Sequence, residues 1–226
     1  YSIEKDKRIK FLQNKKIETL FGQQVSKEIA SELISSSGEL DSKLCKVTVL
    51  FLDIRDFTSF ADSRIPSEVA SFQNIVFSEL IDIINSNNGV INQFLGDGIM
   101  ATFGAPAATN SHAIDAVAAG FKMLKRVDEL GIEEKIPKIR LGIGIHTGRV
   151  LAGNIGNEYR KQYSITGSTV IIASRIEELN KVFDSQFLIS EECYKEIKDH
   201  GYNATAINNA VELKGLKDPM KIYKLI

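Results

Sequence analysis

The distribution of apolar and polar positions divides the chain into two parts near residue 38. In the first part, apolar residues recur at helical spacing among many Lys, Glu and Gln residues: Ile17, Leu20, Phe21, Val25, Ile29 and Leu33. We therefore predict a helical lead-in over residues 1–37, made of two helices that meet near Gly22. The first helix is too polar to be buried alone, which favours a solvated helix or one that pairs with a copy of itself. Residues 35–38 are typical of a linker.

The second part, from residue 43 onwards, alternates short apolar runs with longer segments of helical periodicity. The runs predict strands at residues 47–52, 90–94, 99–103, 139–145, 150–155, 187–189, 211–213 and 221–225. The periodic segments predict helices at residues 66–85, 168–180 and 191–198. A further helix is expected to run through Leu130, with Thr109 or Asn110 as its cap.

Short polar segments separate these elements. Residues 87–89 (Asn-Asn-Gly) are suited to ending a helix, residues 96–98 (Gly-Asp-Gly) to a hairpin, and residues 147–148 (Thr-Gly) to the connection of two strands. The elements begin in the order strand, helix, strand, strand, helix, strand. This is the split βαβ pattern of the ferredoxin-like fold, an α+β class with an antiparallel sheet and helices on one face. We expect this fold over residues 43–226, preceded by the helical lead-in.

Composition narrows the range of functions. With 226 residues and a formal net charge of −1, the chain has no basic excess, so we expect no nucleic-acid partner. It contains neither a bilayer-length apolar run nor a signal sequence, and its two cysteines, Cys45 and Cys193, form no disulfide or zinc framework. A reducing, cytoplasmic location is therefore expected. Because the chain begins without Met, we expect a longer parent protein that could carry membrane spans or a sensor.

Two aspartates stand out because each ends or interrupts a strand-like run. Asp53 ends the run 47–52, and Asp97 lies between the two strands of the predicted hairpin. If these strands are neighbours, two hard carboxylates converge, which suits Mg²⁺ or Mn²⁺ with a nucleoside triphosphate. The alternative is that both are turn residues; Asp97 fits that role well, but Asp53, followed by Ile54, does not. Asp56 is either a further ligand or a helix cap.

Four segments in order carry a family resemblance: residues 51–58, 96–104, 143–150 and 173–177. Together they resemble the class III nucleotidyl cyclases, the adenylyl and guanylyl cyclase catalytic domains of bacterial type. The matches cover residues 43–226, and residues 21–26 are similar to the helical lead-in of bacterial members.

The resemblance implies a homodimer with active sites at the interface. One copy would supply Asp53, Asp97 and the backbone carbonyl of Ile54 to two Mg²⁺ or Mn²⁺ ions. The 3′-hydroxyl of the nucleotide attacks its own α-phosphate, and pyrophosphate leaves. The N–H groups of Phe57 and Thr58, at a helix start, would face the phosphates.

The other copy would supply the transition-state arginine, which matches Arg175. Without the resemblance, the favoured interpretation of Arg175 is an exposed helix residue that pairs with Glu177 or Glu178. The base-reading positions match Gln93 and Ser164, where the family usually has charged or Thr residues. Both side chains donate and accept hydrogen bonds, so charge selects no base. The hydroxyl of Ser164 favours ATP, with GTP second and a pyrimidine third.

Other positions depart from the family pattern. Ile171 stands where a second transition-state residue is usually Asn, a loss that typically lowers the rate by about 10² to 10³. Asn154 and Asn180 are conceivable substitutes. For the phosphate-holding lysine, Leu216 occupies the usual position, which leaves Lys214 or Lys217 as candidates. Two arginines, Arg140 and Arg149, are further candidates, and His146 is expected to be structural.

Three hypotheses follow. The first is a nucleotidyl cyclase, most readily ATP to cyclic AMP. The second is a cyclase-like module that binds triphosphate and dimerises with little turnover, motivated by Ile171 and Leu216. The third, ranked last, is a protein-interaction domain without nucleotide. In the first two, the polar helix of the lead-in is expected to connect an N-terminal sensor or regulatory domain to the catalytic part.

Overall fold

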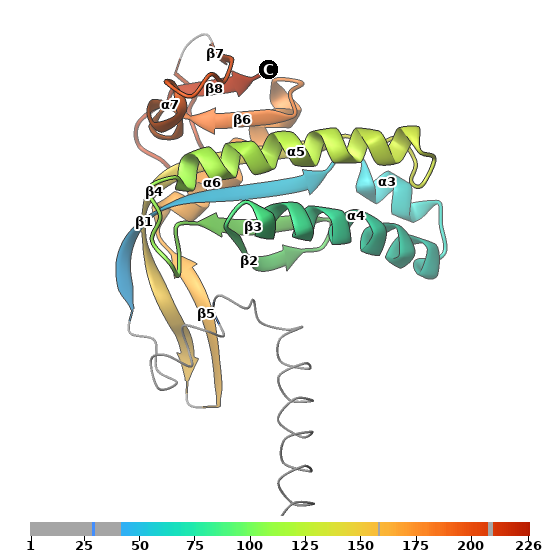
Figure 1. Cartoon of the computed structure of the whole chain (residues 1–226), viewed down its shortest axis with the longest axis horizontal. Coiled ribbons are helices and arrows are strands. Elements are labelled where there is room, and N and C mark those ends of the chain that lie inside the picture. Colours follow the sequence, from blue (N-terminus) through green and yellow to red (C-terminus); the bar gives the residue numbers. More distant parts are fainter. Residues whose placement is uncertain (1–28, 30–41, 158, 208–209) are drawn as a thin grey trace, which may run out of the picture. The chain divides into compact units, whose positions relative to one another are not determined.

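The computed structural model describes residue 29 and residues 42–157, 159–207 and 210–226 (Figure 1). Residues 42–226 form one compact unit. The two predicted helices of residues 1–37 lie outside the described residues, apart from Ile29.

A mixed sheet of eight strands forms the centre of the described unit. Its strands are β1 Lys43–Ile54, β2 Gly89–Leu95, β3 Gly98–Phe103, β4 Leu141–Asn157, β5 Arg160–Thr166, β6 Phe187–Ser190, β7 Ala204–Ala206 and β8 Ile222–Leu225. Seven follow the order β2-β3-β1-β4-β6-β8-β7, and β5 pairs with β4. The pair β4–β6 is parallel and the other pairs are antiparallel.

The helices are α3 Phe57–Asp62, α4 Pro66–Ser86, α5 His112–Ile132, α6 Ser168–Val182 and α7 Glu191–Ile197. The chain order β1-α4-β2-β3-α5-β4 confirms the predicted split βαβ pattern, with β1 and β4 adjacent in the sheet. Helix α4 begins at a proline, which is favoured in the first turn, and ends at the predicted Asn-Asn-Gly segment, where Asn88 has a left-handed φ of 61°.

The two faces of the sheet carry different helices because side chains alternate along β1. Leu50 and Ile54 point to the face where α4, α5 and α7 pack in the main core. Val47 and Val49 point to the opposite face, where they pack near Ala173 of α6. Helices α4 and α5 therefore cover one face, as predicted, and lie in front of the sheet in Figure 1. Helix α6 adds a second layer behind it.

The structure corrects the predicted turn at Thr147 and Gly148. β4 continues across both residues, with Thr147 opposite Thr48 and Gly148 opposite Val47 of β1. The hydroxyls of Thr147 and Thr48 are 2.7 Å apart. A β-carbon at Gly148 would lie 2.5 Å from the hydroxyl of Thr169 in α6. The glycine therefore permits a close approach of α6 to the strand rather than a turn.

The cap predicted for the helix that runs through Leu130 is also wrong. Helix α5 begins at His112, and Ser111 rather than Thr109 or Asn110 occupies the cap position. The Ser111 hydroxyl makes no capping bond; it lies 2.7 Å from a carboxylate oxygen of Asp115, one turn into the helix. This side-chain bond competes with the backbone bond that a cap residue normally accepts.

Strand prediction failed where apolar runs are short. The predicted strand 211–213 is reduced to an isolated bridge between Val211 and Met220. Strands β5 and β7 were not predicted, since β5 is largely polar and β7 has only three residues. Neither presents the apolar run on which the prediction depends.

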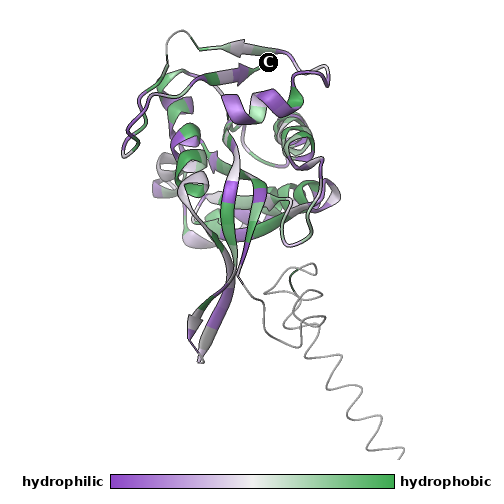
Figure 2. Cartoon of the chain, turned by 90° about the vertical axis from the view of Figure 1, so that its left-hand side faces the viewer, coloured by the Kyte–Doolittle hydropathy of each residue, from purple (hydrophilic) through white to green (hydrophobic). Residues whose placement is uncertain are grey.

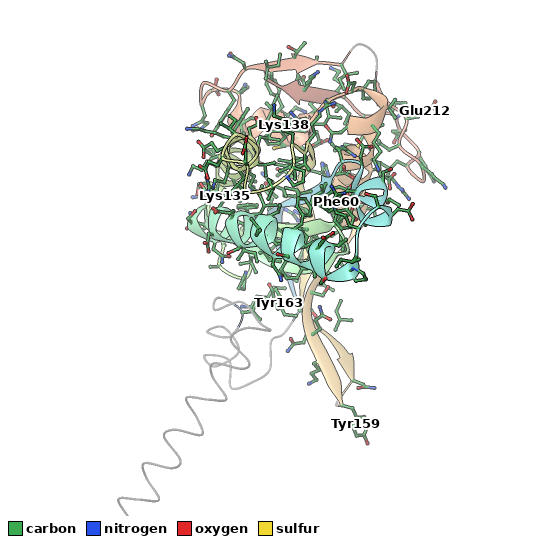
Figure 3. All side chains as sticks on the ribbon, turned by 90° about the vertical axis from the view of Figure 1, so that its right-hand side faces the viewer. Phe60, Lys135, Lys138, Tyr159, Tyr163 and Glu212 are labelled. Atoms are coloured by element: carbon green, nitrogen blue, oxygen red, sulfur yellow. The ribbon has the colours of Figure 1, made fainter. Side chains whose placement is uncertain are left out.

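The far half of β4 and strand β5 form a two-stranded arm. Their pairing runs from Leu151 opposite Thr166 to Asn157 opposite Arg160. Figure 2 shows this ribbon extending beyond the sheet, and Figure 3 shows Tyr159 at its tip. Tyr159 is 90% exposed and Ile155 is 52% exposed. Within the ranges described, no helix combines the length and apolar character that crossing a bilayer requires.

Candidate active site

Asp53 and Asp97 meet at one end of the sheet. β1 and β3 are neighbours, and Asp53 lies opposite Gly98, the residue after Asp97. The Ile54 N–H donates a hydrogen bond of 3.3 Å to the Asp97 carbonyl, which fixes the hairpin against the end of β1. A β-carbon at Gly98 would lie 2.7 Å from the Leu52 carbonyl oxygen, so glycine is required for this approach. The predicted convergence of the two aspartates is confirmed.

The environment of Asp53 favours a cation. Burial raises the pKa of Asp53, and the neighbouring Asp97 carboxylate raises it further, while Lys181 and Arg55 oppose the rise. Two close carboxylates are stabilised in their charged forms by a divalent ion, and their hard oxygens suit Mg²⁺ or Mn²⁺. Together with the Ile54 carbonyl they fit the predicted metal site.

The described residues contain no cluster of three or more His, Cys, Asp or Glu side chains that could enclose a metal. Two carboxylates alone leave most of an octahedral shell to water and phosphate oxygens. This is the usual arrangement for Mg²⁺ bound together with a nucleotide, which retains waters and takes few protein ligands.

Beside the aspartates lies a buried ion pair that the sequence did not reveal. Arg55 Nη2 donates to Glu177 Oε1 at 2.7 Å, and the two side chains are only 10% and 11% exposed. Arg55 Nη1 lies 3.8 Å from Asp53 Oδ2, as does the Nζ atom of Lys181 in α6. Burial raises the pKa of Glu177 to about 7, and the Arg55 guanidinium limits that rise. The adjacency of Arg55 to Asp53 was visible in the sequence, but its partner on α6 was not.

Helix α3 begins next to this cluster. Asp56 takes the cap position with a left-handed φ of 59°, but its side chain makes no capping bond. Phe57 and Thr58 are the first helical residues, whose N–H groups have no acceptor within a helix. Phe57 packs against Phe60 and Phe72, with ring centroids 6.0 Å and 6.3 Å away, which fixes the helix start. The predicted contact of these N–H groups with phosphate stays a prediction.

Gln93 and Ser164 lie on strands that approach one another. Gln93 in β2 pairs with Met100 just after a register shift, and its side chain is exposed. Ser164 in β5 pairs with Gly153 and is half-buried. Neither side chain has a hydrogen-bond partner among the described residues, so both are available to a ligand. Their role in base selection stays a prediction.

Helix α6 carries Arg175 and Ile171 one turn apart, on the same helix face. Arg175 Nη1 contacts both carboxylate oxygens of Glu178 at 2.7 Å, whereas the other predicted partner, Glu177, binds Arg55 instead. The Nε of Arg175 is buried and has no partner in the described ranges. Ile171 is 55% exposed, so an apolar side chain faces outward one turn before the arginine.

Several candidate residues already bind other groups of the chain. Asn180 is buried and donates 3.0 Å hydrogen bonds to the carbonyls of Ile143 and Glu177, which excludes it as a substitute for the missing Asn. Arg140 pairs with Asp184 at 3.0 Å. His146 is structural, as predicted, with its Nδ1 atom 2.8 Å from the Ser190 hydroxyl.

The remaining candidates lie away from the aspartates within one chain. Asn154 is in the arm, opposite Tyr163, and Arg149 is exposed on β4. Lys214 and Lys217 are exposed in the segment before β8, which is separated from β1 by β4 and β6 in the sheet. The structure therefore does not bring these lysines next to Asp53 of the same chain.

Known proteins match this chain over most of its length. The profile of the family described as adenylate and guanylate cyclase catalytic domain matches residues 41–226. An uncharacterised protein of Mycobacterium tuberculosis is 31% identical over 210 residues, which cover 93% of this chain and 36% of that protein. The chain therefore spans about a third of the length of this relative.

Two solved structures share both sequence and fold with the chain. The adenylyl cyclase CyaB from P. aeruginosa has a TM-score of 0.75 and 30% identity, covering 83% of this chain and 96% of that one. The guanylyl cyclase Cya2 has a TM-score of 0.71 and 32% identity, covering 82% and 94%. On the strength of these matches, the chain belongs to the family of adenylate and guanylate cyclase catalytic domains.

Proposed function

We propose that the chain converts a nucleoside triphosphate, foremost ATP, into the 3′,5′-cyclic nucleotide and pyrophosphate. The observation that carries this proposal is the meeting of Asp53 and Asp97 at the ends of β1 and β3. A pair of turn aspartates has no need of burial or of close approach, and Asp53 has both. The 3′-oxygen bonds to the α-phosphorus, and the bond from this phosphorus to the oxygen that bridges the α- and β-phosphates breaks. Pyrophosphate leaves with that oxygen, and the hydroxyl proton passes to solvent.

Asp53, Asp97 and the Ile54 carbonyl are the residues that would hold two Mg²⁺ or Mn²⁺ ions. When bound, the ions lower the pKa of the attacking hydroxyl and neutralise charge on the leaving pyrophosphate. The N–H groups of Phe57 and Thr58 lie next in the chain and would hold the phosphates. Lys214 would reach the triphosphate from the other copy, because it lies away from Asp53 in its own chain.

We propose a homodimer in which Asp53 of one copy works with Arg175 of the other. Three observations support it. Ile155 and Tyr159 are exposed on an arm that extends beyond the sheet, where a second copy can cover them. Ile171 is likewise exposed beside Arg175. Arg175 pairs with Glu178 of its own helix and its side chain is 32% exposed, so the guanidinium can turn to an incoming phosphate.

Base choice rests on Gln93 and Ser164, which are neutral and able to donate or accept. The Ser164 hydroxyl favours ATP, GTP ranks second and a pyrimidine triphosphate third. Similar identity to an adenylyl cyclase and to a guanylyl cyclase, 30% and 32%, gives no further preference.

A second candidate function is a module that binds nucleotide and dimerises with little turnover. The exposed Ile171 favours it, because isoleucine cannot orient the ribose by a hydrogen bond. We also propose that residues 1–37 are a helical lead-in. The mycobacterial relative is much longer, since the chain covers only 36% of it. The lead-in would connect an N-terminal sensor or regulatory domain to a catalytic domain over residues 43–226, located in the cytoplasm.

The deciding experiment incubates the purified chain with ATP, GTP, CTP or UTP and Mn²⁺, and identifies products by mass. We expect one cyclic product, lost in Asp53→Ala and retained in Asp82→Ala, a matched exposed aspartate on α4. A product that survives Asp53→Ala contradicts the proposed metal site. Nucleotide binding without any product supports the second candidate.

A further inference from the structure

Arg55 is shared unequally between two carboxylates. Its Nη2 atom donates to Glu177 Oε1 at 2.7 Å and lies 3.4 Å from the Glu177 carbonyl oxygen. Its Nη1 atom lies 3.8 Å from Asp53 Oδ2, which is too long for a hydrogen bond. Nη1 is buried and has no hydrogen-bond partner in the part of the chain that is described. The guanidinium is thus bound to Glu177 and only near Asp53.

Two glycines of β4 make this arrangement possible. A β-carbon at Gly142 would overlap the Arg55 guanidinium, so the arginine lies flat on bare backbone. A β-carbon at Gly144 would overlap the backbone of Glu177, so α6 is seated directly on the strand. The fold therefore holds both partners of the ion pair in place and shields them from water. Charge interactions in this shielded environment are stronger than in solvent.

We propose that Glu177 is a positioning residue that holds Arg55 away from Asp53 and so keeps the Asp53 carboxylate available to a divalent cation. The inference rests on the proposed metal-binding role of Asp53. A guanidinium bonded directly to a carboxylate competes with a metal ion for the same oxygens. Lys181 also lies 3.8 Å from Asp53, but its side chain is 66% exposed, so water and salt screen its charge.

Two substitutions should change metal binding in opposite directions. Glu177→Gln removes the charge that binds Arg55, so Arg55 turns to Asp53 and metal binding weakens. Adding Arg55→Gln removes the competing cation, so the double variant recovers. If Glu177 served only to seat α6 on β4, the double variant would stay as weak as Glu177→Gln, because it also lacks the ion pair.

The test titrates the purified chain with Mn²⁺ alone and follows the electron paramagnetic resonance signal of the free ion. For Glu177→Gln we expect a dissociation constant raised roughly tenfold, the size of effect of one close charge on an ionising carboxylate. The Arg55→Gln/Glu177→Gln double variant should return to within about twofold of the unmodified chain. Glu134→Gln removes the same charge from an exposed position and is the matched control.

Each result decides one question. Unchanged binding in Glu177→Gln, or a double variant that stays weak, overturns the inference. If Glu177→Gln does not fold, Arg55→Gln alone is decisive, since binding equal to or tighter than that of the unmodified chain is expected and weaker binding overturns the proposal. Asp53→Ala separates this question from the proposed function: if it binds Mn²⁺ normally, the metal site itself is misplaced.

Discussion

Gly144 of β4 and Glu177 of α6 are in direct backbone contact. A β-carbon at Gly144 would overlap both the backbone nitrogen and the α-carbon of Glu177. Because Arg175 lies two residues before Glu177, this contact also sets how far the arginine stands from the sheet. The contact between Gly144 and α6 therefore positions both the ion pair with Arg55 and the proposed transition-state residue.

We expect Gly144→Ala to lower the free energy of unfolding by about 1–3 kcal/mol, the usual cost of forcing an extra carbon into a packed interior. Urea unfolding measures it. Gly131→Ala is the control, because its β-carbon would meet nothing closer than 3.6 Å and glycine is unfavourable within helix α5. That variant should gain about 0.5–1 kcal/mol. Equal changes in the free energy of unfolding in the two variants would contradict close packing of α6 against Gly144.

The sequence predicted those parts of the fold that have strong local signals. The periodicity of residues 66–85 placed α4. The apolar runs beside Asp53 and Asp97 placed the end of β1 and the start of β3, where the two aspartates meet. Sequence patterns failed where tertiary contacts decide. Gly148 looked like a turn but is a packing glycine, and the partner of Arg55 lies 122 residues away on another element. Nothing local to Arg55 or Glu177 encodes that contact.

Ile171→Asn is expected to raise kcat, by up to about 10², with little change in KM. The new amide would orient the ribose in the transition state, a contribution of a few kcal/mol in comparable sites. The stability of the single chain should change little, because Ile171 is 55% exposed there; sedimentation checks that the proposed dimer still forms. Val182→Asn, exposed at the end of the same helix, is the matched control. If Ile171→Asn leaves kcat unchanged, another group already fills this role.

Mixing two inactive chains tests whether the site is shared between copies. Asp53→Ala and Arg175→Ala should each abolish most activity in a homodimer. In their heterodimer one site regains both residues and the other loses both. Equal amounts mixed at random give half heterodimers, each with one of two sites intact, so about a quarter of full activity is expected. Absence of recovery, despite heterodimers seen by differently tagged pull-down, would place both residues in one chain's site.

Removal of residues 1–34 tests the proposed lead-in. We expect the truncated chain to keep its base preference, because Gln93 and Ser164 are retained, but to dimerise more weakly and turn over more slowly. Sedimentation and steady-state rates measure the two effects. If dimerisation and rate both match those of the whole chain, the lead-in has no regulatory connection to the site.

His146 predicts a loss of stability in mild acid. Burial lowers its pKa from 6.5 to about 4, although Glu192 opposes the shift. As pH falls below 6.5, the unfolded chain takes up a proton that the folded chain refuses, so the free energy of unfolding decreases until about pH 4. Between pH 7 and pH 5 this residue accounts for about 2 kcal/mol. Urea unfolding at both pH values should show a correspondingly smaller decrease for His146→Asn, whereas His200→Asn, at an exposed position, should retain the decrease of the unmodified chain. An equal decrease in both variants would mean that other groups cause the acid sensitivity.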